Sequence, residues 1–169
     1  MLEGSEVLTL LAEIFVSFAG FTGIVAVLGQ RSDGVWRPID VLRFRGLLFA
    51  SLFGLVLAIT PFGLHHIGVI DTVTWGSGSA ILAILIVVML VSLISEHKKV
   101  RATEDPDFVP GVRSFLVLLS GPVVITLVLN AVGVGLRHSF SGYLVGLLYL
   151  LIMCAAMFAL LLRFVRSDT

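Results

Sequence analysis

The sequence predicts an all-α integral membrane protein, a bundle of five transmembrane helices with the N-terminus outside and the C-terminus in the cytoplasm. Three observations lead to this fold class: an apolar composition, five long apolar segments, and an uneven distribution of basic residues. Of the 169 residues, 58% are hydrophobic and only 13% are charged, and the mean hydropathy is +1.11. A soluble domain carries about 25% charged residues. The formal net charge is zero, so we expect no nucleic-acid partner.

The five apolar segments are long enough to be membrane spans, since a spanning helix needs about 20 mostly apolar residues. They cover residues 7–29, 41–64, 75–95, 113–136 and 143–163. The linkers leave no room for a soluble domain, so we expect residues 1–169 to form a single transmembrane domain. No Lys or Arg precedes the first segment, and it exceeds the roughly 7–15-residue apolar core of a signal peptide. We therefore expect the first segment to be a helix of the mature protein.

The basic residues predict the orientation, because Lys and Arg near the ends of spans prefer the cytoplasmic side. With five spans, the first linker, the third linker and the C-terminus share one side of the membrane. The basic residues that flank these regions are Arg31, Arg37, Arg43, Arg45, Lys98, Lys99, Arg101, Arg113, Arg163 and Arg166. Only Arg137 falls on the other side. We therefore expect a multi-pass protein of the cell membrane, which is the inner membrane in a bacterium.

Glu13 is the one acidic residue inside a predicted span. A charged group at the bilayer centre costs at least about 2.5–3.5 kcal/mol on insertion scales, so such an acid indicates a functional role by default. Counting from Val7 at ~1.5 Å per residue places Glu13 ~9 Å below the outer boundary. At this depth its role is open between a structural hydrogen bond, a cation or proton site, and contact with a partner protein's helix.

Other polar residues are expected near the same depth. Asn130 lies six residues before Leu136 and therefore also ~9 Å below the outer face. A lipid-facing carboxylate or amide would have no partner, so we expect Glu13 and Asn130 both to face the interior. Arg137 lies two helical turns beyond Asn130, and its long side chain could reach back to pair with Glu13. The remaining polar groups expected within a turn or two of this level are Thr60, Ser79 and Tyr149.

Small residues recur at helical spacing in two spans. Ala19, Gly23 and Ala26 share one stripe of the first span, and Gly142 and Gly146 form a GxxxG pattern at the start of the fifth. Such residues let helix backbones approach closely. The interpretation that we favour is packing within the bundle, with an interface between copies as the alternative.

Basic and aromatic residues at the cytoplasmic ends predict anchors at the membrane interface. Such clusters are attracted to anionic headgroups, so we expect anionic lipids as partners at this face. Asp40 and Arg43, three residues apart, can also pair on one helix. The third linker, with its basic "EHKKVR" and acidic "EDPDF", is the best candidate contact for a soluble partner. The predicted anchors are Trp36, Arg37, Arg43, Arg45, Lys98, Lys99 and Arg101.

Histidines at the outer ends do not predict a metal site. His65 and His66 are adjacent, so their side chains point about 100° apart, and His138 and Asp71 lie on other segments. The sequence contains no motif of a catalytic, metal or cofactor site, and its single cysteine, Cys154, excludes an intrachain disulfide. A lipid-handling enzyme would need a reactive polar group at one headgroup level, which only these histidines offer.

We interpret the sequence as a small polytopic membrane protein, an oligomeric ion or proton channel or transporter that uses Glu13. Five helices alone leave little room for a solvated path, so we expect a homo-oligomer or a membrane complex. Asn130, Thr60, Tyr149 and Arg137 would give polar support. The alternative is a non-transporting scaffold, sensor or effector subunit that acts through its cytoplasmic loops.

Overall fold

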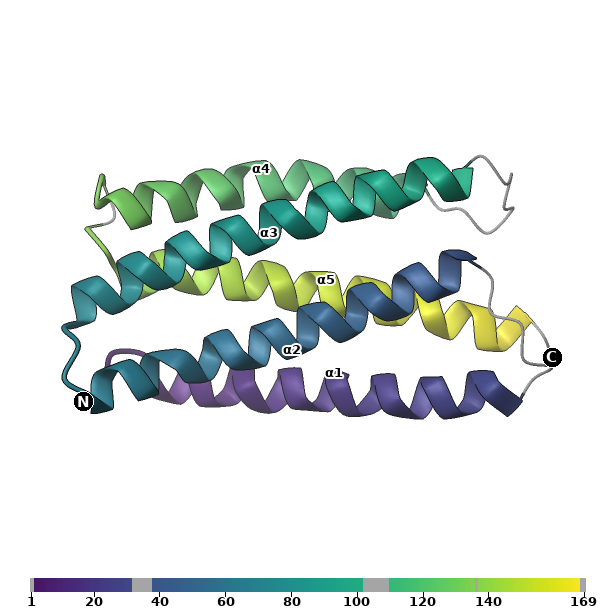
Figure 1. The fold of residues 1–169 in the computed structure, drawn as a ribbon, viewed down its shortest axis with the longest axis horizontal. Coiled ribbons are helices and arrows are strands. Elements are labelled where there is room, and N and C mark those ends of the chain that lie inside the picture. The colour runs from purple at the N-terminus through teal and green to yellow at the C-terminus, as the bar shows by residue number, and fades with distance from the viewer. Residues whose placement is uncertain (1, 32–37, 102–109, 136, 168–169) are drawn as a thin grey trace.

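The structure is a computed structural model that describes residues 2–31, 38–101, 110–135 and 137–167. Its elements are five helices, drawn in Figure 1, and the described ranges contain no strand. Each helix is long and apolar enough to cross a membrane, as predicted. These features suggest a multi-pass membrane protein. In chain order the helices are α1 (Ser5–Arg31), α2 (Pro38–His66), α3 (Asp71–Arg101), α4 (Pro110–Val132) and α5 (Phe140–Ser167).

The fourth helix ends earlier than the sequence predicts. The predicted span runs to residue 136, whereas α4 ends at Val132. Gly133 adopts a left-handed conformation with φ 79°, and the amide of Val134 donates to the carbonyl of Leu129 at 2.9 Å. This is a Schellman cap, which closes a helix although the apolar composition continues beyond it. The correction places Asn130 in the last turn of α4, so the depth counted from residue 136 is too large.

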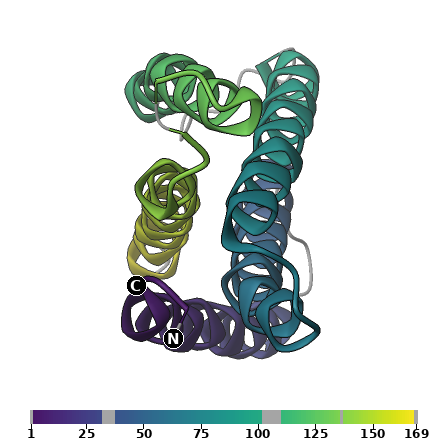
Figure 2. The ribbon, with the colours of Figure 1, turned by 90° about the vertical axis from the view of Figure 1, so that its left-hand side faces the viewer.

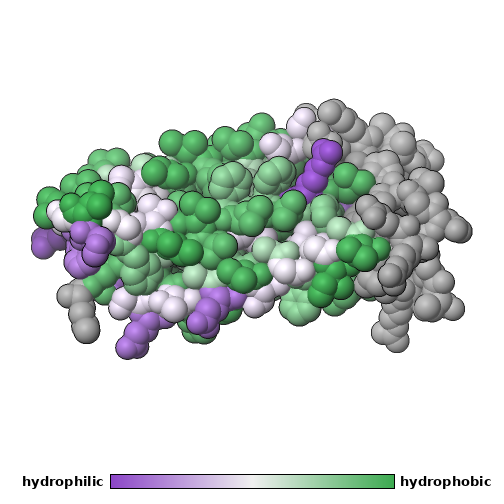
Figure 3. Space-filling model, turned by 60° about the horizontal axis from the view of Figure 1, so that its bottom comes forward, coloured by the Kyte–Doolittle hydropathy of each residue, from purple (hydrophilic) through white to green (hydrophobic). Residues whose placement is uncertain are grey.

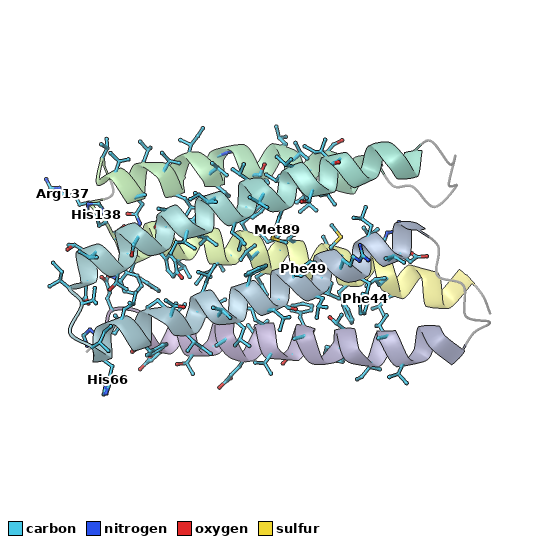
Figure 4. All side chains as sticks on the ribbon, in the orientation of Figure 1. Phe44, Phe49, His66, Met89, Arg137 and His138 are labelled. Carbon is cyan, nitrogen blue, oxygen red and sulfur yellow. The ribbon has the colours of Figure 1, made fainter. Side chains whose placement is uncertain are left out.

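The other four helices pack around α5, which contacts each of them. Figure 2, viewed from the end that holds the N-terminus, shows α1 and α4 at opposite edges, with α2 and α3 between them facing α5. Among the described residues α1 packs mainly on α2, touches α5 lightly, and makes no contact with α3 or α4. We call the two ends of the bundle the N-terminal end and the C-terminal end. The labelled residues His66, Arg137 and His138 lie at the N-terminal end (Figure 4).

One stripe of α1 holds it against the bundle. Leu8, Leu11 and Phe15 recur at helical spacing and are almost fully buried. The ring of Phe15 lies where a Cβ at Gly54 of α2 would stand. Glycine at this position therefore lets α1 and α2 approach closely.

The surface of the bundle is largely apolar. Hydrophobic side chains cover most of the middle of the face drawn in Figure 3, while many hydrophilic ones gather toward its left-hand end. Large apolar side chains are exposed on every helix, including Leu118 of α4 at 78% and Ile84 of α3 at 66%. An exposed apolar surface of this extent is unusual for a soluble monomer and fits contact with lipid.

Candidate functional site

Glu13 lies on the exposed face of α1. Leu11 and Phe15 mark the packed face, and at 100° per residue Glu13 lies about 200° away from either, on the opposite side. Its carboxylate has no hydrogen-bond or ion-pair partner within the described part of the chain. The expectation that Glu13 faces the interior is therefore wrong for the single chain. Large apolar side chains such as Val16 and Ile24 are also exposed on α1, so an apolar residue does not by itself mark the packed face.

Asn130 faces the interior, as predicted, and is fully buried. Its side-chain amide donates to the Ser79 hydroxyl at 2.8 Å and to the backbone carbonyl of Ser139 at 3.0 Å. Its side-chain oxygen accepts the backbone amide of Ser139 at 2.8 Å. One side chain thus joins α3, α4 and the start of α5. Its bonds within the chain identify Asn130 as a structural group of the bundle.

The predicted partners of Glu13 lie elsewhere. Asn130 is on α4, which α1 does not contact in the described part of the chain. Arg137 is exposed in the turn before α5, where its backbone adopts a left-handed conformation with φ 49°, and none of the ion pairs among the described residues joins it to Glu13. The hydroxyl of Thr60, also exposed, donates to the Val56 carbonyl of its own helix at 2.7 Å.

Tyr149 is buried, but it does not belong with Asn130. Its hydroxyl donates to the backbone carbonyl of Leu116 at 3.2 Å and so joins α5 to α4. Leu116 lies 14 residues before Asn130 on α4, which is about 21 Å along a helix. The polar residues predicted near one level therefore do not converge on one site in the described chain.

Tyr143 is a polar contact that the sequence reasoning missed. Its buried hydroxyl donates to the backbone carbonyl of Leu57 at 2.6 Å. In a regular helix that carbonyl would accept the amide of residue 61, which is Pro61 and has no N–H. Tyr143 of α5 therefore satisfies a backbone group that the proline leaves open in α2. The signal was a proline inside the second span, although nothing local indicated which distant side chain would serve it.

The two patterns of small residues differ in their surroundings. A Cβ at Gly142 would lie 2.5 Å from Cγ of Asn130, and one at Gly146 would overlap Leu82 of α3. The prediction of internal packing is confirmed for this pair. Gly23 of α1 is exposed, and nothing among the described residues lies within 4 Å of where its Cβ would stand. The α1 stripe is therefore not packed within the single chain at this position.

The predicted interface anchors fall into three groups. Arg43 is buried and pairs with Asp40 at 3.0 Å, which confirms the predicted pair and places this arginine inside the bundle. Arg45 is exposed and forms no hydrogen bond or ion pair within the described residues. Trp36 and Arg37 lie outside the described residues, as do the side chains of Lys98, Lys99 and Arg101.

A groove of about 400 Å³ lies between α2, α3 and α5, in the half of the bundle toward the C-terminal end. Its floor includes Met153 and Met157 of α5, each only 4% exposed. Figure 4 shows Phe49 of α2 and Met89 of α3 on the sides of the groove. Among the described residues its lining is almost entirely apolar, and Arg45 is the one charged residue in it.

The histidines at the N-terminal end serve separate contacts. Nδ1 of His65 lies 3.4 Å from a carboxylate oxygen of Asp71 across the connection between α2 and α3. The His138 ring lies where Cβ atoms at Gly76 and Gly133 would stand, 2.7 and 2.6 Å from its two nitrogens. It therefore fills the space between α3 and the end of α4. No cluster of three metal-ligating side chains occurs in the part of the chain that the structure describes.

Comparison of this chain with protein-family models, with curated proteins and with solved structures finds no match. The arguments below therefore depend on the geometry of the chain itself.

Proposed function

We propose that this chain forms an oligomer in the cell membrane and carries protons or monovalent cations along a path that copies of α1 share. The observation that carries the proposal is the exposed carboxylate of Glu13, which has no partner in the described residues. An acid facing lipid is costly, and contact with other protein surfaces lowers this cost. A second copy of the chain supplies such a surface.

The exposed face of α1 has further properties that suit this role. Glu6, Thr9, Glu13, Ser17 and Gly20 fall within about 80° of arc around the helix, at 100° per residue, and all are exposed. The hydroxyls of Thr9 and Ser17 donate to the carbonyls of residues 5 and 13 in the same helix, and they can still accept a hydrogen bond. The Cβ positions of Gly20 and Gly23 are open. This face thus offers polar groups beside a surface that a second helix can approach.

A path through the middle of one chain has less support. The buried side chains Asn130, Ser79, Tyr143 and Tyr149 are hydrogen-bonded to one another or to backbone groups. The rest of the core is predominantly apolar. We therefore propose that Asn130 and Tyr149 hold α3, α4 and α5 together, and that Glu13 binds the transported ion.

The proposed orientation has the N-terminus outside and the C-terminus in the cytoplasm. Most basic residues belong to the C-terminal end of the bundle. Lys and Arg near the ends of spans prefer the cytoplasmic side, which supports this orientation. In a bacterium this membrane would be the inner one. Glu13 then lies in the outer half of the bilayer.

The test is proton and monovalent-cation flux into proteoliposomes that contain the wild type or Glu13→Gln, with oligomer size measured for both. We expect Glu13→Gln to lose flux while it keeps its oligomer size and helix content. Glu3→Gln is the matched control, because it makes the same change at an exposed acid that precedes α1 and lies outside this face, and its flux should remain. If Glu13→Gln conducts like the wild type, Glu13 is not the site.

Absence of flux in the wild type, over a range of pH and membrane potential, would contradict the transport proposal. A wild type that remains oligomeric without flux would point to the non-transporting alternative, a scaffold, sensor or effector subunit. Binding partners should then be sought on residues 96–108, most of which lie outside the described residues.

A further inference from the structure

We propose that the groove between α2, α3 and α5 binds one acyl chain of an anionic phospholipid, whose phosphate pairs with Arg45. This would be a specific lipid site, distinct from general attraction between a basic surface and the membrane. It does not depend on transport through α1, because no side chain of α1 that the structure describes lines the groove.

The length of the groove fits one leaflet of a bilayer. Its lining on α2 runs from Val41 to Phe53, which spans ~18 Å at 1.5 Å per residue. On α3 the lining runs from Leu85 to Leu93, or ~12 Å by the same rise. The hydrocarbon layer of one leaflet is ~15 Å deep, half of the ~30 Å bilayer core. An acyl chain in the groove would thus run from the headgroup level at the C-terminal end to about the middle of the membrane.

Burial along the groove shows that it opens to the outside of the bundle. Phe49 and Val88 are 51% and 56% exposed, whereas Met153 and Met157 behind them are almost completely buried. Figure 1 shows α2 and α3 side by side in front of α5, which agrees with the contacts among these three helices. A lipid could therefore enter sideways from the bilayer without any helix having to separate.

The residues at the bottom of the groove are flexible, and one residue of its lining is a glycine. Methionine side chains are flexible and polarizable, so they adapt to an irregular apolar ligand. Gly46 lines the same groove, and a Cβ there would lie 3.7 Å from Met157, in ordinary van der Waals contact. A larger side chain at Gly46 would extend from that point into the groove. The volume of about 400 Å³ lies within the 300–1,000 Å³ typical of ligand pockets.

The charge in the groove, which lies four residues or ~6 Å in from its Val41 end, fits a phosphate. Arg45 lies near the start of α2 and has no ion-pair partner among the described residues, whereas neighbouring Arg43 pairs with Asp40. A guanidinium presents several N–H donors in a geometry that matches phosphate oxygens. Basic pockets between helices at the cytoplasmic side are a recognised way to bind anionic lipid headgroups. A helix of a second chain would cover the apolar lining, but it would give no partner to Arg45 unless it carried an acid there.

The experiment uses the full chain in liposomes with a phosphatidylglycerol that carries a diazirine in its acyl chain, and maps the labelled residues by mass spectrometry. We expect labels on residues 41–53 and 85–93 and near Met153 and Met157. A phosphatidylcholine with the same chain should label the same residues less. Inorganic phosphate should not compete, because without an acyl chain it lacks the apolar contacts.

Two variants separate the tail from the headgroup. Gly46→Leu should reduce labelling of the groove by both lipids about tenfold or more, because it removes room for two or three methylenes. Arg45→Gln should reduce phosphatidylglycerol labelling about fivefold, toward the phosphatidylcholine level, because it removes one cation near the surface. The matched controls are Gly63→Leu, at an open position near the other end of α2, and Arg137→Gln, which removes a cation at the opposite end.

Three results would overturn the proposal: labels spread evenly over lipid-facing residues, labelling that Gly46→Leu leaves unchanged, or equal labelling by the two lipids with wild-type Arg45. A fourth result, labelling of the monomeric fraction alone, would also overturn it, because a second copy of the chain would then occupy the groove in the oligomer. Flux is not a readout here, so failure of the transport proposal and failure of the lipid proposal are distinguishable.

Discussion

The Tyr143 hydroxyl donates a 2.6 Å hydrogen bond to the carbonyl of Leu57, the backbone group whose usual amide donor is replaced by Pro61. The bond joins residues that are 86 positions apart in the chain. It links α5 to α2 at a point where the backbone of α2 would otherwise carry an unpaired carbonyl inside an apolar helix. Proline, carbonyl and tyrosine thus form one structural unit.

This unit makes a prediction about stability. Tyr143→Phe removes the donor and should lower the free energy of unfolding in detergent by about 1–2 kcal/mol, as for other hydrogen bonds between membrane helices. In a Pro61→Ala background the amide of residue 61 can serve Leu57, so the same Tyr143→Phe change should cost clearly less. Thermal or denaturant unfolding of the four proteins gives this double-mutant cycle. Equal costs in the two backgrounds would mean that Tyr143 does not compensate for the proline.

The Asn130 bonds predict an order of stability among three variants. Asn130→Leu removes all three bonds to Ser79 and Ser139 and should cost about 2 kcal/mol, given about 0.6 kcal/mol or more for each. Ser79→Ala removes only one of them and should cost less. Ser77→Ala, an exposed site on the same helix as Ser79 whose hydroxyl bonds to backbone carbonyls within α3, provides the comparison. Denaturant unfolding measures the order, and a larger loss for Ser79→Ala than for Asn130→Leu would contradict this account.

Gly146 of α5 lies close to side chains of α3 and α4, which predicts the effect of adding one methyl group at this position. Gly146→Ala would bring Cβ into the side chain of Leu82 and also within 3.0 Å of Leu127, so we expect a loss of about 1–3 kcal/mol from overpacking. Gly63→Ala makes the same change where nothing lies within 4 Å and should be neutral or slightly stabilising. Unfolding midpoints of the two variants test this difference. Similar midpoints would show that Leu82 can move aside.

The exposed face of α1 predicts where copies of the chain meet. Cys154 is the single cysteine and is buried, so a cysteine placed on the surface would be the one accessible thiol. We expect Gly20→Cys to form disulfide-linked dimers in membranes under mild oxidation, because its Cβ position is open on the proposed interface. Leu118→Cys, on the exposed face of α4 far from α1, should remain largely monomeric. Equal crosslinking at both sites would mean random collision, and none at Gly20 would argue against α1 as the interface.

The sequence was a good guide to the helices and a poor guide to their faces. Five apolar segments predicted five helices, and the one clear error in their limits came from Gly133, whose left-handed backbone closes α4 within an apolar stretch. Asn130 was predicted to face the interior because an amide needs a partner, and the partners are there. Glu13 was expected inside by the same argument, but its partner is not within the described chain. Lipid and protein interior are equally apolar, so composition cannot separate them.

Contacts between distant residues could not be predicted from the sequence, for a different reason. Pro61 marks a carbonyl that needs a donor, yet every other predicted span contains residues with a hydroxyl group. Only the packing of α5 against α2 selects Tyr143. The groove beside Arg45 is likewise a property of three helices together, since each of them alone presents an ordinary apolar face.

The central position of α5 has a consequence for how the protein is made. Chains are synthesised from the N-terminus, so α5 leaves the ribosome after the other four helices. It brings Tyr143 to Leu57 and Tyr149 to Leu116, and the residue just before it, Ser139, serves Asn130. Until α5 has been made, the carbonyl of Leu57 lacks its side-chain donor and the Asn130 side chain lacks its bonds to Ser139. Synthesis of α5 is then also the step that joins the earlier helices in one arrangement, and a product truncated before α5 would leave these groups without their α5-side partners.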